Sequence, residues 1–374
     1  MNSLFRNSIL TVILTITFLF SSRATFGWGA IGHNAIKEKA TEEMTDDAKK
    51  GVDDLFSDLP SDQLANVANF PDLVRHSHGW EHTSSYHFAD IPKGAEYFSN
   101  LKARIEAVQQ KGEDLSSAGD VVQTILRALD ILRDYTQGKA DKASAATAAK
   151  FLIHMIGDAH QPLHVGYPED LGANRIIDGS TINGKVVKYI LQGKQPARWN
   201  GRPINLHAVW DEIIIGITYE KLFGSLRPNP VEAGKLYSQH LGKPSESDFA
   251  DWIANLSPEA WAMEEREALI DIYNDVVAFN SDLDQYIPKY GPLVDKRIFQ
   301  GGIRLSTTLN QIFDPQGPQI SSDEAALRMK LGTIYTACNV SLANIIRLTQ
   351  EDAGVDTAPR PRIIQPEPAH VQTQ

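Results

Sequence analysis

Histidine and aspartate recur at a spacing of four in two apolar segments of the sequence. In "HMIGDAHQPLH", His154 and Asp158 are four positions apart, and His164 follows closely. In "NLHAVWDEIIIG", the same spacing separates His207 from Asp211. Residues four apart on an α-helix leave the same face, so each pair can present two ligands together. Imidazole and carboxylate groups are the ligands of catalytic zinc sites, so the two pairs predict a zinc centre.

The repetition of this pattern carries more weight than either pair alone. A single pair is weak evidence, because such residues often form a surface hydrogen bond. Both pairs lie in apolar helical segments, where buried histidines would otherwise each need a polar partner. Upstream, "FPDLVRHSHGW" and "SSYHFADIP" add Asp72, Arg75 and His87. From spacing alone, Asp72 and His87 are no stronger candidates than the loop histidines beside them. Those loop histidines, which we expect to be solvated, are His76, His78 and His82.

Helical patterns dominate the segments that must position these residues. The alanine-rich, then apolar, stretch 141–160 predicts the helix that carries the first pair. Further helices are expected at 114–138, at 257–280 with Ser257 as the N-cap, and at 321–350. Between residues 174 and 193, β-branched runs flank an Asn-Gly pair, which predicts a β-hairpin. The proline-rich, polar stretch 351–374 predicts a disordered tail. We therefore expect an all-α, single-domain protein with one small hairpin insertion.

Composition narrows the classes of protein that the chain can belong to. The single cysteine, Cys338, excludes an intramolecular disulfide framework. The formal net charge of −11 argues against broad electrostatic binding of duplex nucleic acid, which usually requires a basic surface. Several bound divalent cations would offset much of that charge.

The N-terminal residues predict a secretory signal peptide. Arg6 supplies positive charge, residues 8–20 form an apolar run, and small residues follow. The apolar run is shorter than the roughly 18 residues that a spanning helix needs. We predict a signal peptide over residues 1–27, cleaved between Gly27 and Trp28. A secreted or periplasmic location follows.

Eight motifs, read in chain order, resemble one known family. They are "WGAIGH", "FPDLVR", "YHFAD", "HMIGDAHQPLH", "GAN", "NLHAVWD", "WAMEE" and "GIRLSTTLN". The chain is similar to the trinuclear-zinc, single-strand-specific nucleases and 3′-nucleotidases of fungi and plants, which have bacterial relatives. These share a superfamily with zinc-dependent phospholipase C. The resemblance implies a mainly helical nuclease domain over residues 28–350, with a family-like core to about residue 310 and an extra helix at 321–350.

The resemblance also implies three zinc ions and their ligands. The ligand sets are Asp72, His87, His154 and Asp158 for one ion; His164, His207 and Asp211 for a second; and His33, Asp158 and Trp28 for the third. Asp158 would bridge two ions. Trp28 would bind through its α-amino nitrogen and its carbonyl oxygen, which requires signal cleavage immediately before it. The reference pKa of an α-amino group is about 7.7–8.0, so a metal can displace its proton at modest cost.

The family's activity suggests roles for the remaining candidates. A zinc-bridging hydroxide would attack phosphorus and yield 5′-phosphorylated products. Arg75, three residues after the ligand Asp72, would support charge on the phosphoryl oxygens. Phe88 and Asp90 match positions that stack on and hydrogen-bond a nucleobase, and Asn174 matches an active-site asparagine. The expected substrate is single-stranded DNA or RNA, or a 3′-nucleotide. The expected state is a monomer without a stable protein partner.

Two alternatives remain open from the sequence. The first is a phospholipase C that uses the same three zinc ions on a lipid phosphodiester. Its relatives typically carry glutamate at the last ligand position, so Asp211 favours a nuclease. The second is an exported zinc-binding protein without enzymatic activity, in which Arg75 would have no catalytic role.

Overall fold

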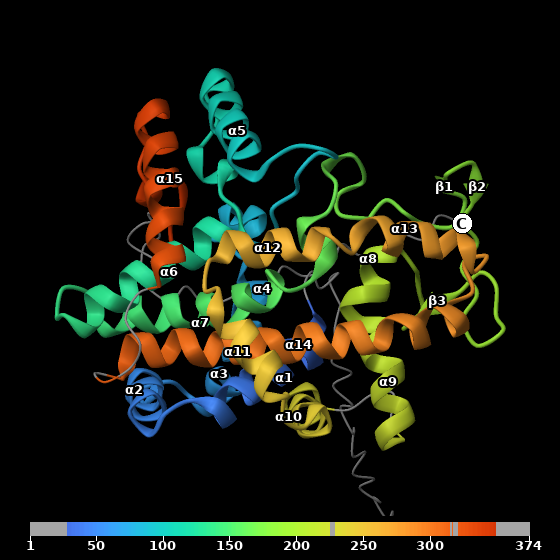
Figure 1. Ribbon diagram of the computed structural model, residues 1–374, viewed down its shortest axis with the longest axis horizontal. Coiled ribbons are helices and arrows are strands. Elements are labelled where there is room, and N and C mark those ends of the chain that lie inside the picture. The colour runs from blue at the N-terminus through green and yellow to red at the C-terminus, as the bar shows by residue number, and fades with distance from the viewer. Residues whose placement is uncertain (1–27, 225–228, 315, 317–320, 349–374) are drawn as a thin grey trace, which may run out of the picture.

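Helices form most of the described chain, which comprises residues 28–224, 229–314, 316 and 321–348 of this computed structural model (Figure 1). The long helices are α1 (Gly29–Glu43), α2 (Asp46–Phe56), α5 (Tyr97–Lys111), α6 (Val121–Thr136), α7 (Lys142–Asp158), α9 (Ile214–Phe223), α10 (Pro230–Leu241), α11 (Glu246–Ala254), α12 (Pro258–Arg266), α13 (Leu269–Ala278), α14 (Leu283–Phe313) and α15 (Ser322–Cys338). The short helices are α3 (Ser61–Ala65), α4 (Phe70–Val74), α8 (Leu206–Ala208) and α16 (Leu342–Ile345). The expectation of an all-α fold is confirmed.

Tighter and wider turns of helix connect these elements. The 3-10 helices are η1 (Val67–Asn69), η2 (Glu81–His87), η3 (Leu115–Ala118), η4 (Pro162–Val165) and η5 (Pro168–Asp170). Helix η6 (Val209–Ile213) is a π-helical turn between α8 and α9. The predicted signal peptide (1–27) and the predicted tail (351–374) lie outside the described residues. No helix of the described ranges combines the length and the apolar character needed to cross a membrane.

The arrangement is layered around α7 and α14. In Figure 1, α14 crosses the molecule horizontally, with α12 and α13 above it and with α2, α1 and α10 below it. Helix α7 packs against α6, α1, α4 and α14, and nearly all of its side chains from Ala145 onward are buried. A helix enclosed on all sides must be apolar all round. Its alanine-rich sequence meets that need, and the side chain of Asp141 caps its first turn.

Two small hairpins break the helical pattern. Their strands are β1 (Thr181–Ile182) with β2 (Lys185–Val186), and β3 (Arg198–Trp199) with β4 (Arg202–Pro203), each pair antiparallel. Both hairpins turn on an Asn-Gly pair with positive φ at both residues, at positions 183–184 and 200–201. Two-residue hairpin turns favour this conformation, which asparagine and glycine tolerate best. The hairpin predicted within 174–193 is confirmed. The second was missed, although "WNG" carries the same signal.

Three predicted helices differ in their limits. The helix expected over 114–138 begins only at Val121, because the Asp120 side chain caps it there and residues 115–118 form η3. The helix expected over 321–350 ends at Cys338, because Asn339 adopts a left-handed backbone with φ of 53° and reverses the chain. Its last two residues, 349–350, lie outside the described ranges.

The helix expected over 257–280 is two helices, α12 and α13. Ser257 does occupy the N-cap position, but its side chain makes no capping hydrogen bond in the described structure. The break follows Arg266, and the two halves pack against different partners. Helix α12 lies against η4 and α6, whereas α13 lies against α14 and β1. Tertiary packing therefore decides a break that the local sequence does not signal.

Candidate metal centre

Elements from across the chain bring the predicted ligand side chains to one buried place. His33 lies on α1, Asp72 on α4, His87 at the end of η2, and His164 on η4. Helix α7 contributes His154 and Asp158 from its last two turns, and the α8–η6 segment contributes His207 and Asp211. Their ligand atoms fall into three groups, and within each group they lie within 4.8 Å of one another. The groups are His33, His154 and Asp158; Asp72, His87 and His154; and His164, His207 and Asp211.

Asp158 lies at the centre of this arrangement and is fully buried. One carboxylate oxygen, Oδ2, lies 2.9 Å from Nδ1 of His87 and 3.3 Å from Nε2 of His154. The other, Oδ1, lies 3.4 Å from Nε2 of His33 and 3.5 Å from Nδ1 of His164. A single carboxylate therefore faces histidines from four different elements. This geometry suits a carboxylate that bridges two cations.

Three histidines are oriented by backbone carbonyl groups. His154 donates from Nδ1 to the Ala68 carbonyl at 2.8 Å, and His164 donates from Nδ1 to the His87 carbonyl at 2.7 Å. His207 donates likewise to the Gly172 carbonyl at 2.6 Å. In each case the opposite nitrogen, Nε2, faces a carboxylate. Metal-binding histidines are usually oriented by such a hydrogen bond from the second ring nitrogen.

Several buried polar atoms of the cluster lack a hydrogen bond within the described residues. They are Nδ1 and Nε2 of His33, Nε2 of His87, Oδ1 of Asp158 and Nε2 of His164. Leaving such a buried group unpaired costs about 1–3 kcal/mol, so several together in one place require an explanation. Nitrogen and oxygen donors aimed at common points are the donor set that zinc binds. The residues therefore fit a metal centre.

Burial also sets the protonation states that a metal needs. It lowers the pKa of His33, His87 and His164 well below the usual range, so these imidazoles are neutral and can bind metal. Burial raises the pKa of Asp72 to about 6. Burial, together with the nearby Asp211, raises the pKa of Asp158 well above its ordinary value. Without a cation the cluster cannot easily hold its carboxylates ionised, and a cation removes that penalty.

The chain enters α1 directly beside this cluster. Trp28 precedes the helix, its side chain is buried, and its carbonyl accepts a hydrogen bond from Gly32 N–H at 3.2 Å. At Gly29, with φ of 53°, an added Cβ would lie only 2.9 Å from the backbone oxygen of Asp211. Close backbone approach at this position requires glycine. Trp28 therefore directly precedes a glycine whose backbone lies close to the backbone of the predicted ligand Asp211.

A cavity of ≈270 Å³ opens beside the cluster. Its lining residues are Phe88, Asp90, Leu163, His164, Leu171, Asn174 and His207. The three predicted substrate-binding residues thus share a cavity with two predicted ligands. Burial raises the pKa of Asp90 to about 6. The Asn174 side chain donates to the Leu171 carbonyl at 3.0 Å, which leaves its amide oxygen facing the Asn205 side chain at 3.5 Å.

Arg75 lies next to the cluster, beside the predicted ligand Asp72. Its side chain is 96% buried, and its guanidinium lies 3.2 Å from the Asp72 carboxylate. The three histidines expected to be solvated, His76, His78 and His82, take no part in the three groups. For His82 the expectation of a solvated loop position is wrong, because it lies within η2 and is partly buried. His78 is fully exposed near Glu81, and His82 makes a 3.1 Å hydrogen bond with the Arg347 carbonyl.

Two residues near the site were missed by sequence reasoning. Gln161 donates to the Asp211 carboxylate at 2.5 Å and accepts from Leu163 N–H at 2.5 Å, so it orients a predicted ligand. Its position within "HQPLH", three residues before the predicted ligand His164, is only a weak indication that it contacts the site. Arg266 donates to backbone carbonyl groups on two segments that carry Asp90 and His164. Those carbonyl groups belong to Ile91, Pro92, Val165 and Gly166. No local pattern points to Arg266.

Comparison with known proteins gives a consistent result. Residues 28–184 and 193–314 match a family model described as S1/P1 Nuclease. Endonuclease 2 of Arabidopsis thaliana is 27% identical over 316 residues, which is 82% of this chain and 97% of that protein. Nuclease S1 of Aspergillus oryzae is 24% identical over 302 residues, 78% of this chain and 93% of that protein. Nuclease P1 of Penicillium citrinum is 23% identical over 301 residues, which is 76% of this chain and 97% of that protein.

The match to the family model begins at Trp28. It includes every residue predicted to bind metal or substrate, and it omits residues 185–192, which contain β2 and the residues after it. The matched residues make up well over half of the chain, and they are the residues that build the buried cluster and its cavity. The chain therefore belongs to the S1/P1 nuclease family.

Proposed function

We propose that this protein is an exported endonuclease that hydrolyses single-stranded DNA or RNA, and also 3′-nucleotides, with three zinc ions. The observation that carries the proposal is the buried carboxylate of Asp158, which faces His33, His87, His154 and His164 at 2.9–3.5 Å beside a cavity lined by Phe88 and Asp90. The printed names of the relatives, endonucleases and nucleases, support the reaction class.

The proposed ligand sets follow the three groups. Asp72, His87, His154 and Asp158 would hold one ion; His164, His207 and Asp211 a second; and His33, Asp158 and the Trp28 backbone the third. Zinc at these positions would supply a hydroxide at neutral pH and stabilise charge on the phosphate and on the leaving 3′-oxygen. The protein's part is to hold the donors in fixed directions. The hydrogen bonds from Nδ1 atoms to carbonyl groups, and from Gln161 to Asp211, serve that purpose.

Arg75 and Asp72 form the proposed catalytic pair on the protein side. The buried guanidinium lies 3.2 Å from the carboxylate, so Asp72 orients it while also serving as a ligand. A fixed positive charge in a site shielded from water interacts strongly with developing negative charge on a phosphoryl group. Arg75 therefore stabilises the transition state more than the ground state.

The proposed substrate preference rests on the cavity. An aromatic ring such as Phe88 can stack only on a base that is not paired in a duplex, which favours single strands. The Asp90 carboxylate, in the same cavity, would accept hydrogen bonds from the edge of that base. Asn174 would orient a phosphate at the opening.

Export and processing belong to the same proposal. Cleavage between Gly27 and Trp28 would create the α-amino ligand, and the start of the family match at Trp28 supports that position. The mature nuclease domain would comprise residues 28–350, followed by a disordered tail at 351–374. The protein would be secreted or periplasmic and monomeric.

One experiment tests the function and separates it from the alternatives. The zinc-loaded protein, purified after export, is assayed on a single-stranded oligonucleotide, a 3′-nucleotide and phosphatidylcholine vesicles. N-terminal sequencing and the zinc content of the same preparation are measured. We expect a mature chain that begins with Trp28, three zinc ions, and cleavage of the oligonucleotide and the 3′-nucleotide. Lipid turnover without nucleotide turnover would establish the phospholipase, and zinc binding without any turnover would establish a binding protein.

A further inference from the structure

The hairpin segment, residues 174–203, has a charge opposite to that of the whole chain. It contains six basic residues and one acidic residue, whereas the chain has 36 basic and 47 acidic residues. The basic residues, all exposed, are Arg175, Lys185, Lys188, Lys194, Arg198 and Arg202. A basic surface on an acidic protein concentrates the attraction for a polyanion in one place. The part of the segment at 185–192 lies outside the family match, so it is a feature that the family model does not describe.

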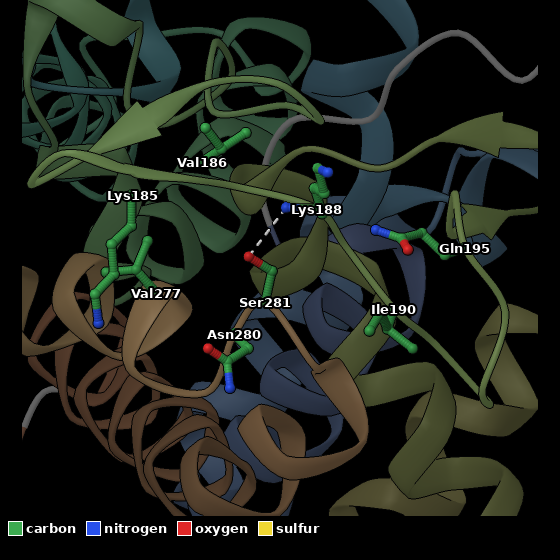
Figure 2. Close-up of a pocket in the computed structure, with 8 residues that line it drawn as sticks. All are labelled: Lys185, Val186, Lys188, Ile190, Gln195, Val277, Asn280 and Ser281. Carbon is green, nitrogen blue, oxygen red and sulfur yellow. Dashed lines mark hydrogen bonds between the residues drawn. The ribbon is translucent and has the colours of Figure 1, made fainter.

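Two of these lysines border a cavity of ≈440 Å³ (Figure 2). Its polar lining residues are Lys185, Lys188, Gln195, Asn280 and Ser281, and Val277 adds an apolar surface. The lining comes from two parts of the chain: residues 185–195, which begin with β2, and residues 277–281, which include the end of α13 and the turn before α14. A 3.1 Å hydrogen bond from Lys188 N–H to the Ser281 hydroxyl joins them (Figure 2).

The lysine side chains of this cavity are available for an anion. Within the described ranges, the ammonium groups of Lys185 and Lys188 form no ion pair and no hydrogen bond. Carboxylates near the lining residues along the chain are engaged by other donors. Asp282, beside Ser281, accepts from Asp284 N–H at 3.0 Å and from the Gln285 side-chain amide at 2.7 Å, and Asp275 pairs with Lys289. Asp178 accepts from Tyr189 N–H at 2.7 Å, and Asp284 accepts from Gln192 N–H at 3.0 Å and Gly193 N–H at 3.2 Å. The cavity therefore combines ammonium, amide and hydroxyl donors with no competing carboxylate on its wall.

Both ends of the segment are anchored at the candidate active site. At its start, Asn174 lines the cavity that contains Phe88 and Asp90. Just after its end, Leu206 N–H donates to the Ile176 carbonyl at 3.0 Å, directly before the predicted ligand His207. The basic segment is thus a single connection that begins and ends beside the candidate active site.

We propose that the basic cavity is a remote subsite that binds a backbone phosphate of the same single strand whose cleaved nucleotide occupies the Phe88 cavity. The proposal rests on the proposed nuclease function and adds a determinant of substrate length. Lys185 and Lys188 supply charge, while Gln195, Asn280 and the Ser281 hydroxyl can donate hydrogen bonds to phosphate oxygens. A backbone contact of this kind carries no sequence information, so it favours long strands of any sequence over short ones.

The test compares two double variants of the zinc-loaded protein. Lys185→Gln/Lys188→Gln removes the charge of the cavity. Lys235→Gln/Lys243→Gln is the matched control, because these lysines are also exposed and lie on α10 and the following loop, far from β1 and β2 in Figure 1. We measure kcat/KM on oligothymidylates from the dinucleotide to about 30 nucleotides, at several salt concentrations.

The cavity variant should lose activity only on long strands. We expect a loss on the order of three- to ten-fold for the longest substrate, because exposed ion pairs are individually weak, and no loss for the dinucleotide. The slope of log(kcat/KM) against log[salt] should become shallower by about 0.7 for one lost phosphate contact. The control variant should match the wild type. An equal loss on all lengths, or no loss on any, overturns the proposal.

Failure of the nuclease function is distinguishable from failure of the subsite. If the wild type cleaves no strand, the function fails. Binding of a labelled long single strand to the same variants is then measured by fluorescence anisotropy. Weaker binding of the cavity variant alone supports the subsite, and equal binding of wild type and both variants contradicts it.

Discussion

The buried cluster and the basic hairpin segment differ in how their charged groups are held and how far they are exposed to water. In the cluster, Asp158 is fully buried, and two of its histidine neighbours, His154 and His164, are held by hydrogen bonds to the backbone. In the hairpin segment, Lys185 and Lys188 are exposed, long and flexible. Fixed donors in a dry site act strongly over short distances, whereas flexible charges in water act weakly and are screened by salt. We therefore expect the reaction chemistry to depend on the first region and the proposed preference for long strands on the second.

The largest expected effect comes from the centre of the cluster. Asp158→Asn leaves the shape but removes the charge shared by the histidine neighbours. We expect a loss in kcat/KM on the order of a thousand-fold or more, the scale of losing a preorganised electrostatic group, and reduced zinc content. Zinc analysis by mass spectrometry and oligonucleotide hydrolysis check this. Asp53→Asn on the exposed face of α2 is the control. Full activity in Asp158→Asn would remove the cluster from the mechanism.

Arg75 tests whether the cluster binds metal only or also catalyses. Arg75→Ala should retain zinc and lose kcat by about a hundred- to a thousand-fold, because a positioned charge that acts on the transition state is gone. Arg75→Lys should recover only part of the rate, since an ammonium cannot reproduce the planar fork. Zinc content and steady-state kinetics are compared. Unchanged turnover in Arg75→Ala would favour a role for the arginine in structure alone.

Gln161 tests how much the orientation of ligands matters. Gln161→Ala removes the hydrogen bond to Asp211. Loss of such a partner typically lowers metal affinity by about 10- to 100-fold. We expect zinc affinity to fall by that factor and activity to recover in excess zinc. Titration with a competing chelator measures the affinity. A rate loss that excess zinc does not reverse would assign Gln161 a role other than orienting the ligand.

Phe88 tests the proposed stacking of a substrate base in the cavity beside the cluster. Phe88→Ala should raise KM for single strands by roughly 5- to 100-fold, since stacking on one base contributes about 1–3 kcal/mol, and should leave zinc content unchanged. Phe88→Tyr should keep most of the affinity. This effect should appear on a dinucleotide as well as on long strands. The smaller, salt-dependent loss expected for Lys185 and Lys188 should appear on long strands only, and that contrast separates the two regions experimentally.

Local sequence determined much of this protein. The four-residue spacing of His154 and Asp158 predicted that both side chains leave one face of a helix, and α7 has that form. The Asn-Gly pair at positions 183–184 predicted the first hairpin, because its backbone needs positive φ at both residues. Alanine-rich and apolar stretches predicted the enclosed helices. These features depend on interactions among residues a few positions apart, so periodicity and turn chemistry reveal them.

Tertiary structure decided the rest. Spacing alone could not single out Asp72 and His87 from the histidines around them, because they face Asp158 and His154 on α7, far along the chain. Neither the division of 257–280 into two helices nor the contacts of Arg266 with two distant loops has a local signal. The same holds for the basic cavity, where the hairpin meets the α13–α14 turn. Contacts between distant segments depend on how whole elements pack, and a local pattern carries no record of that packing.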